Sequence, residues 1–196
     1  MATVDVELVA RICQSATYAA AVGRGAVLDV VIDPLDGSAW VRLASGSHAL
    51  EAATALQAFG LAVSDREDNR VQAAGWDARL LRRRLGMLLA GVDDLQAEWD
   101  ATAELVRYHR DRRVKVTGED PDPSEVLADV ERALRDARPI PHRCPNVTDV
   151  GSLLQLVDAA EDAYAQLIVR HVEHAAGVLE ADAEDCGADA NRQSYT

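Results

Sequence analysis

The sequence predicts an α+β fold: a small antiparallel sheet with helices, in the order α-β-β-α-β-β, followed by a long-helix hairpin or three-helix bundle. Two hairpin patterns alternate with alanine-rich helical patterns in the first part of the chain. From Asp77 onward, apolar residues recur at spacings of three and four, which is typical of long amphipathic helices. Aromatic residues make up only 4% of the chain, so Leu, Val and Ala must fill the core. The predicted parts are an α+β lobe over 1–76, a helical, coiled-coil-like region over 77–180 and a polar tail over 181–196.

The lobe begins with a helix and a hairpin. Residues 5–22 predict the helix because Val9 and Ile12 fall at helical spacing on an apolar face. Two β-rich runs, 26–32 and 38–44, then flank the sequence DPLDG. Pro and Asp-Gly are residues that a tight turn requires, so these runs predict a hairpin.

A second helix and a second hairpin complete the lobe. Ser47 is expected to cap an alanine-rich helix over 48–59, which Gly60 can end. The runs LAVS (61–64) and RVQAAGW (70–76) are separated by the polar sequence DREDN, a pattern that predicts a hairpin. Helices on one face of this antiparallel sheet would bury its apolar side.

Three helices are expected after residue 76. The first runs without interruption from Asp77 to the basic cluster that ends at Lys115. A shorter helix is expected over 124–137, the last one over 148–180, and a mobile tail after it. The two long apolar rows should pack on each other or on a second copy of the chain. The rows are Leu81, Leu85, Leu88, Val92, Leu95, Trp99, Thr102 and Val106 in the first helix, and Val150, Leu153, Val157, Ala160, Tyr164, Leu167, His171, His174 and Val178 in the last.

Two histidines interrupt the apolar row of the last helix. His171 and His174 are three residues apart, so they share one helical face, as two ligands of one metal ion would. His109 lies on the row of the first long helix and would come near them if the three helices run up, down and up. Three interpretations stay open: histidines bonded to backbone or water at a bundle end, a divalent metal site, and a proton-sensitive junction.

The turn sequence DPLDGS resembles the Asp-Pro-Leu/Ile-Asp-Gly-Ser/Thr signature of the inositol monophosphatase and fructose bisphosphatase superfamily. The resemblance implies that Asp33 and Asp36 bind divalent metal ions, with Gly37 and Ser38 at a phosphate. The Trp-Asp pair that ends at Asp77 is similar to a later motif of the family and would add a third ligand.

The same turn also fits a plain hairpin. Only Glu7 precedes it, where the superfamily has paired glutamates, and Asp77 follows Asp36 after 41 positions, fewer than the family's sheet insert needs. A magnesium-dependent phosphatase site and a structural turn are therefore both open at Asp33 and Asp36.

Four arginines crowd the start of the first long helix: Arg79, Arg82, Arg83 and Arg84. The helix dipole disfavours positive charge at this end by a few tenths of a kcal/mol per residue, so the helix itself does not explain them. They are candidate contacts for an acidic protein segment, a phosphate or nucleic acid. Pairing with acidic residues of the same chain is the alternative.

Composition narrows the classes of function. A chain of 196 residues that is 48% hydrophobic can bury a core without disulfides or metal. Its three cysteines form no CxxC pair, and neither a leader sequence nor a run of about 18 apolar residues is visible, so a cytoplasmic protein without a membrane segment is expected. The net charge of −13 disfavours sequence-independent binding of nucleic acid.

No nucleotide-binding glycine motif and no GxSxG motif occurs in the sequence. We therefore expect a non-catalytic cytoplasmic interaction or assembly protein without a cofactor, which self-associates or docks a protein partner through its long helices. The first alternative is a nucleic-acid-binding or regulatory module that uses Arg79–Arg84. The second is a metal-dependent, phosphatase-like enzyme that uses the DPLDGS turn.

Overall fold

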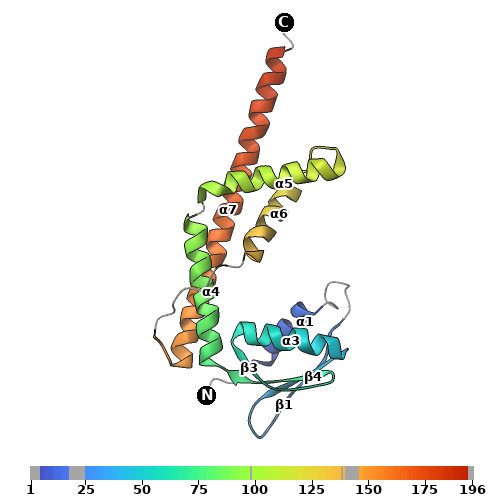
Figure 1. Cartoon of the computed structure of the whole chain (residues 1–196), viewed down its shortest axis with the longest axis vertical. Coiled ribbons are helices and arrows are strands. Elements are labelled where there is room, and N and C mark those ends of the chain that lie inside the picture. Colours follow the sequence, from blue (N-terminus) through green and yellow to red (C-terminus); the bar gives the residue numbers. More distant parts are fainter. Residues whose placement is uncertain (1–4, 18–24, 98, 138, 140–145, 194–196) are drawn as a thin grey trace. The chain divides into compact units, whose positions relative to one another are not determined.

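In the computed structural model, residues 5–17, 25–97, 99–137, 139 and 146–193 are described, with side chains as far as Ala183. The described chain forms a four-stranded antiparallel sheet, six α-helices and one short 3-10 helix (Figure 1), which confirms the predicted α+β class. The elements are α1 (Val6–Ala16), β1 (Val27–Ile32), β2 (Ala39–Leu43), α3 (Gly46–Phe59), β3 (Leu61–Glu67), β4 (Arg70–Trp76), α4 (Ala78–Ala97), η1 (Trp99–Ala101), α5 (Thr102–Thr117), α6 (Pro123–Asp136) and α7 (Val150–Gln193).

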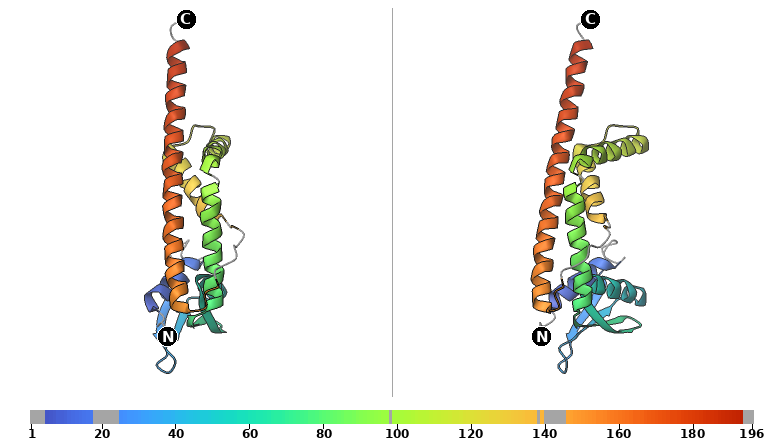
Figure 2. Two further views of the ribbon diagram at one scale, coloured as in Figure 1. Left: turned by 90° about the vertical axis from the view of Figure 1, so that its left-hand side faces the viewer. Right: turned by 60° about the vertical axis from the view of Figure 1, so that its left-hand side comes forward.

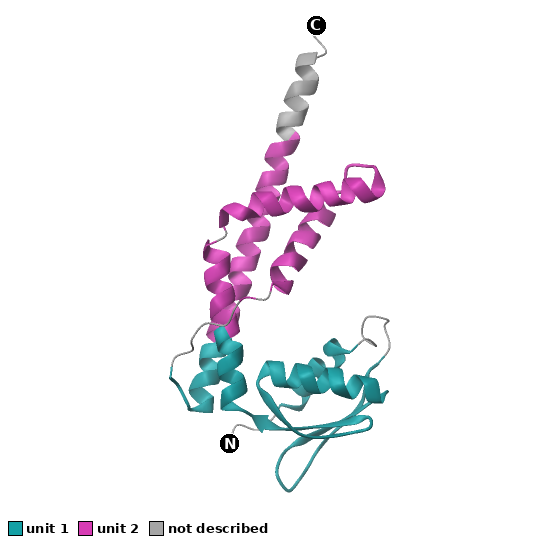
Figure 3. Ribbon diagram, viewed as in Figure 1, with its two compact units in different colours: residues 1–86, 142–158 teal, residues 87–141, 159–196 magenta. Residues whose placement is uncertain are grey.

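The chain divides into two compact units, shown in different colours in Figure 3. Unit 1 comprises residues 1–86 and 142–158, and unit 2 comprises residues 87–141 and 159–196. Both α4 and α7 contribute residues to each unit. The sheet, α1 and α3 belong to unit 1, and α5 and α6 belong to unit 2.

The sheet of unit 1 has the strand order β1-β2-β4-β3, and all its pairs are antiparallel. Helices α1 and α3 lie on one face of it (Figure 1). The core between them includes Val9 of α1, Leu56 of α3 and Val41 and Val71 of the central strands, which are all fully buried. The expected order of helices and hairpins in this part of the chain is confirmed.

Several boundaries in unit 1 differ from the sequence prediction. Strand β3 continues to Glu67, into the sequence DREDN that was expected to be a loop. Helix α1 ends at Ala16 because Thr17 has an extended backbone, whereas a helix to residue 22 was expected; residues 18–22 lie outside the described chain. The cap of α3 is Ser45 rather than Ser47, since its hydroxyl accepts from the backbone N–H of Ser47. The predicted stop at Gly60 is confirmed, because Gly60 has left-handed backbone angles.

The first long helix is not continuous, and this corrects the sequence prediction. It is divided into α4 and α5 by the 3-10 turn η1, which begins at Trp99. In an unbroken helix the Leu95 carbonyl would accept from the N–H of residue 99. Here the ring Nε2 of His171, 2.8 Å away, donates to that carbonyl. A side chain inserted into the backbone ladder in this way is a known cause of helix breaks.

The predicted apolar rows are nevertheless buried over much of their length. Leu81 and Leu85 of α4 and Leu153 and Val157 of α7 are at most 2% exposed. In unit 2, α4 and α7 run side by side in both sets of views (Figures 1 and 2). Their approach is close at Gly91, where a β-carbon would lie 2.8 Å from the ring of Tyr164. The absence of a side chain at Gly91 therefore makes room for an aromatic ring of α7.

The last helix is longer than expected. Its apolar row predicts an end near residue 180, but α7 continues to Gln193. The sequence after 180 is rich in alanine and contains no proline, so a helix can continue through it even though Gly187 is a weak helix former. Residues 181–193 are therefore helical rather than an irregular tail.

Candidate functional site

Strand β1 and the turn after it expose more large aliphatic side chains than any other segment of similar length in the described chain. β1 is an edge strand of the sheet. Leu28 is 56% exposed, Val31 55%, Ile32 39% and Leu35 94%. Exposed apolar side chains scattered singly are ordinary, but four within eight residues on a sheet edge mark a surface that other chains can cover.

Trp40 extends this apolar surface onto the open face of the sheet. Val31 and Trp40 are directly paired across β1 and β2, and they point away from the helix-covered face because their neighbours Val30 and Val41 point toward it. A hollow of about 480 Å³ lies there, with Arg42 and Arg70 at its border. Ile32 is two residues after Val30 and pairs with Ala39, so it lies on the helix-covered side of the strand, and the exposed side chains occupy both sides of this edge. We call Leu28, Val31, Ile32, Leu35 and Trp40 together the β1 surface.

Both aspartates of the DPLDGS turn hold the turn's own backbone. The Asp33 carboxylate accepts from the N–H of Leu35 at 2.8 Å, and the Asp36 carboxylate accepts from the N–H of Ser38 at 2.8 Å. Hydrogen bonding by the Ser38 side chain, and next by the Ser38 N–H, holds the pKa of Asp36 below its ordinary value. The Asp33 carbonyl accepts from the N–H of Gly37, which has a positive φ of 73°. The expected hairpin is present at this position.

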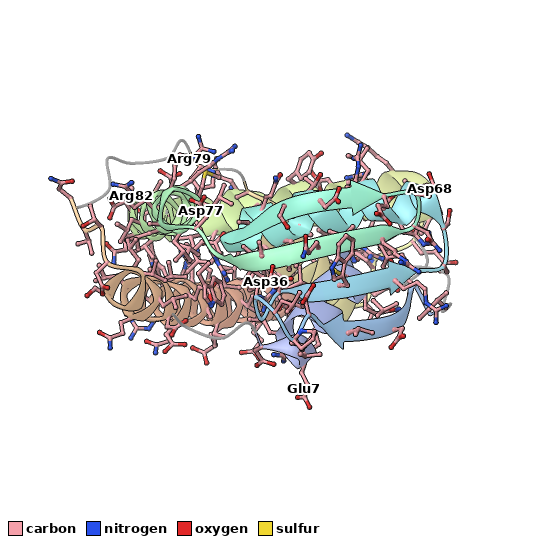
Figure 4. The ribbon with its side chains drawn as sticks, turned by 90° about the horizontal axis from the view of Figure 1, so that it is seen from below. Glu7, Asp36, Asp68, Asp77, Arg79 and Arg82 are labelled. Carbon is pink, nitrogen blue, oxygen red and sulfur yellow. The ribbon has the colours of Figure 1, made fainter. Side chains whose placement is uncertain are left out.

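Neither Asp77, which the phosphatase resemblance implies as a third ligand, nor Glu7, the one glutamate before the turn, is on the same element as Asp36. Glu7 is on α1 and points away from Asp36 (Figure 4). Asp77 caps α4, since its carboxylate accepts from the backbone N–H groups of Arg79 and Leu80 at 2.7 and 3.0 Å. Ser38, which the resemblance places at a phosphate, is 1% exposed and accepts from the side-chain amide of Gln72 at 2.7 Å.

The four arginines at the start of α4 do not form one surface. Arg84 donates to the Phe59 carbonyl at 2.7 Å and lies over the Phe59 ring at 3.7 Å, so it joins α4 to the end of α3. Arg82 is half-buried and donates to the Ala78 carbonyl of its own helix. Arg79 and Arg83 are exposed, and they stand four residues apart on one helical face. Figure 4 shows Arg79 and Arg82 beside Asp77 at the helix start.

His171 is buried within unit 2 and both of its ring nitrogens have polar partners. Its Nε2 lies 2.8 Å from the Leu95 carbonyl, and its Nδ1 lies 2.7 Å from the Thr102 hydroxyl. A carbonyl oxygen can only accept, so Nε2 carries the hydrogen, and in the neutral ring Nδ1 accepts from Thr102. The residue therefore links α7 to the end of α4 and to the start of α5.

His174 and His109 have different surroundings. The ring of His174 stacks on Trp99, with centroids 5.0 Å apart, and Trp99 also meets His171 edge-on at 4.7 Å. His109 is on α5 and lines a groove between α5 and α6. Among the described residues, no group of three or more His, Cys, Asp or Glu side chains is placed to hold a metal ion.

Cys13 belongs to the core of unit 1 and is fully buried. Burial raises the pKa of its thiol to about 12, which keeps the sulfur in its unreactive protonated form.

The β1 surface is the feature that the sequence analysis missed. The run VLDVVI has apolar residues at both odd and even positions, a pattern of strands covered on both faces. Leucine at position 35, within a turn, was a second signal, because turn positions favour small and polar residues.

Comparisons of this chain with protein-family models, with curated proteins and with solved structures found no match. No helix in the described part of the chain combines the length and the hydropathy that crossing a bilayer requires.

Proposed function

We propose that this protein is a non-catalytic interaction protein that self-associates through the β1 surface. The observation that carries the proposal is the exposure of Leu28, Val31, Ile32 and Leu35 along an edge strand. An edge strand presents a row of backbone groups without ladder partners, which a further strand can pair with. Covering the aliphatic side chains would at the same time remove apolar area from water.

A second copy of the chain is the occupant that the strand fits best. Antiparallel pairing of one strand with itself obeys a two-fold axis, the commonest symmetry of protein dimers. Charge does not oppose this pairing, because Asp29 is the only ionisable residue of β1 and lies 3.8 Å from Arg42 of the same chain. Natural edge strands are protected from such pairing by lysine, proline, other charges or a bulge. β1 has no lysine or proline, and its one charge and its bulge both lie at its start, between Val27 and Asp29, so Val30–Ile32 is the part open to a second strand.

The test is the mass of the protein in solution. We expect sedimentation equilibrium to find a dimer that dissociates on dilution, and the Val31→Lys variant to be monomeric at concentrations where the original chain is dimeric. Val169→Lys is a matched control, because Val169 is 53% exposed and lies on α7. A monomer at all concentrations, or a dimer that Val31→Lys leaves intact, would contradict the proposal.

A second candidate function uses Arg79 and Arg83. Both are exposed, and neither side chain has an ion-pair partner within the described ranges. Two unpaired guanidinium groups on one face of a helix can contact the phosphates of nucleic acid. The expected result is salt-dependent binding of duplex DNA that Arg79→Ala/Arg83→Ala removes and that Arg107→Ala, at an exposed position of α5, retains. Equal binding by all three proteins would reject this function.

A further inference from the structure

A groove between α5 and α6 contains a buried histidine without a polar partner. The two helices are consecutive in unit 2 and pack together around Val106, Val126 and Val130 (Figure 1). The groove has a volume of about 420 Å³, which lies in the range of small-molecule sites. Its polar lining comes from His109, Arg112, Arg113 and Thr117 on α5 and from Asp129, Arg132 and Asp136 on α6.

His109 is the unusual member of this lining. It is 8% exposed, and no hydrogen bond joins its ring to any described residue. Among the described residues, its ring contact is the edge of Tyr108, with centroids 5.1 Å apart. In the part of the chain that the structure describes, the only fully buried side-chain nitrogen or oxygen without a hydrogen bond is His48 Nδ1, so the ring nitrogens of His109 are open to the groove. A ligand or ordered water in the groove can therefore bond to them directly.

The charged residues around His109 leave positive charge available. Arg113 Nε and Arg132 Nη1 contact the two different oxygens of Asp129, at 2.6 and 3.2 Å, so this carboxylate is neutralised by the protein itself. Arg113 Nη1 also pairs with Glu125 at 2.6 Å. Arg112 is exposed and has no ion-pair partner among the residues that the structure describes. Its whole guanidinium fork is free to bind an anion.

We propose that this groove binds the phosphoryl group of a small soluble molecule, with Arg112 as the free charged donor, His109 as a neutral donor, and Arg132 as a further donor through the guanidinium nitrogens that Asp129 does not contact. A free guanidinium fork matches the oxygens of a phosphate, and the additional donors suit the three oxygens of a phosphoryl group. Asp136 stands seven residues after Asp129, about 10 Å along α6, and therefore at the far end of the groove from that ion pair.

The electrostatics of His109 support this assignment. Burial is the main cause that holds the pKa of His109 below its ordinary value; the Asp129 charge opposes this shift, and Arg112, Arg113 and Arg132 add to it. The ring is therefore mainly neutral at pH 7 and has one N–H to donate. A bound dianion would add negative charge beside the ring and move its titration midpoint upward.

The experiment follows the histidine ring signals of the full chain by NMR during titration with inorganic pyrophosphate at constant ionic strength. The His109 signals, assigned with His109→Gln, are expected to shift saturably, and the titration midpoint of the ring is expected to rise when pyrophosphate is bound. Acetate at the same ionic strength should leave them in place. Arg112→Gln should weaken pyrophosphate binding by about tenfold or more, since a charge-assisted contact is lost.

Arg107→Gln is the matched control, because Arg107 is an exposed arginine of α5 that does not line the groove. It removes the same charge and should leave the affinity within about twofold of the original. Equal weakening by both variants, or His109 signals that do not respond, would overturn the proposal. Vesicles that contain phosphatidic acid form the last arm: binding to these vesicles without binding to pyrophosphate would overturn the assignment to a soluble ligand.

Discussion

Two buried histidines of unit 2, His171 and His109, differ in their hydrogen-bond partners. Both side chains are more than nine-tenths buried, with 1% and 8% exposure. Both nitrogens of His171 are engaged, by the Leu95 carbonyl and the Thr102 hydroxyl. His109 has no hydrogen-bond partner in the described chain, and it faces a groove with three arginines.

The difference separates a structural histidine from a candidate ligand-binding one. Burying a polar ring is unfavourable unless hydrogen bonds replace those made to water. At His171 the replacement is complete, and the same bonds fix the break between α4 and α5. At His109 no described residue supplies a hydrogen bond, and the ring nitrogens are open to the groove. A ligand in the groove can bond to them directly, which is the basis of the proposed phosphoryl site.

The largest effect is expected from His171→Leu. Leucine fills a similar space but leaves the buried Thr102 hydroxyl and the Leu95 carbonyl without the ring. We expect the free energy of unfolding to fall by about 2–3 kcal/mol, as measured by urea denaturation. His109→Leu, the matching change at the other histidine, should cost little or increase stability, since no protein hydrogen bond is lost.

A gain in stability from His171→Leu would contradict this distinction between the two histidines. It would mean that the two hydrogen bonds of His171 do not compensate for burial of the ring. His174→Leu provides a further reference, because His174 is half-buried and its described contact is the stacked Trp99 ring.

A smaller effect is expected from Thr102→Val. Valine has nearly the shape of threonine, so the change removes one hydroxyl from a site that is 2% exposed and leaves His171 Nδ1 unpaired. The expected loss is about 1 kcal/mol in the same urea measurement. In a double-mutant cycle with His171→Leu, the combined loss should be smaller than the sum of the two. Simple additivity would show that the two side chains act independently.

Much of the fold follows from local chemistry that the sequence displays. Turn residues predict where both hairpins lie. Gly60 ends α3 because a residue without a β-carbon readily adopts left-handed backbone angles. The break at Trp99 could not be predicted in this way, because its cause is His171, which lies 72 positions later in the chain. The sequence around residue 99 contains neither proline nor glycine, the residues from which a helix break is usually predicted.

The candidate sites depend even more on tertiary contacts. Four arginines at the start of α4 look alike in sequence, yet Arg84 is half-buried against the carbonyl and ring of Phe59 while Arg79 and Arg83 are exposed. Likewise, the spacing of His171 and His174 suggested a pair with one role. Only the packing of Thr102 and Leu95 around His171 shows that the two rings have different partners.

The smallest expected effect is the pH dependence that His109 adds to stability. Its pKa in the folded protein lies below the ordinary value of 6.5, chiefly through burial, while the unfolded chain has the ordinary value. As the pH falls through about 6.5 toward the lowered folded pKa, the unfolded chain takes up this proton first, so stability decreases with falling pH. His109→Leu should remove that part of the decrease between about pH 7.5 and pH 5.5 in urea unfolding. An identical pH profile in the variant would show that the burial of His109 is already compensated in the protein, and the contrast with His171 would disappear.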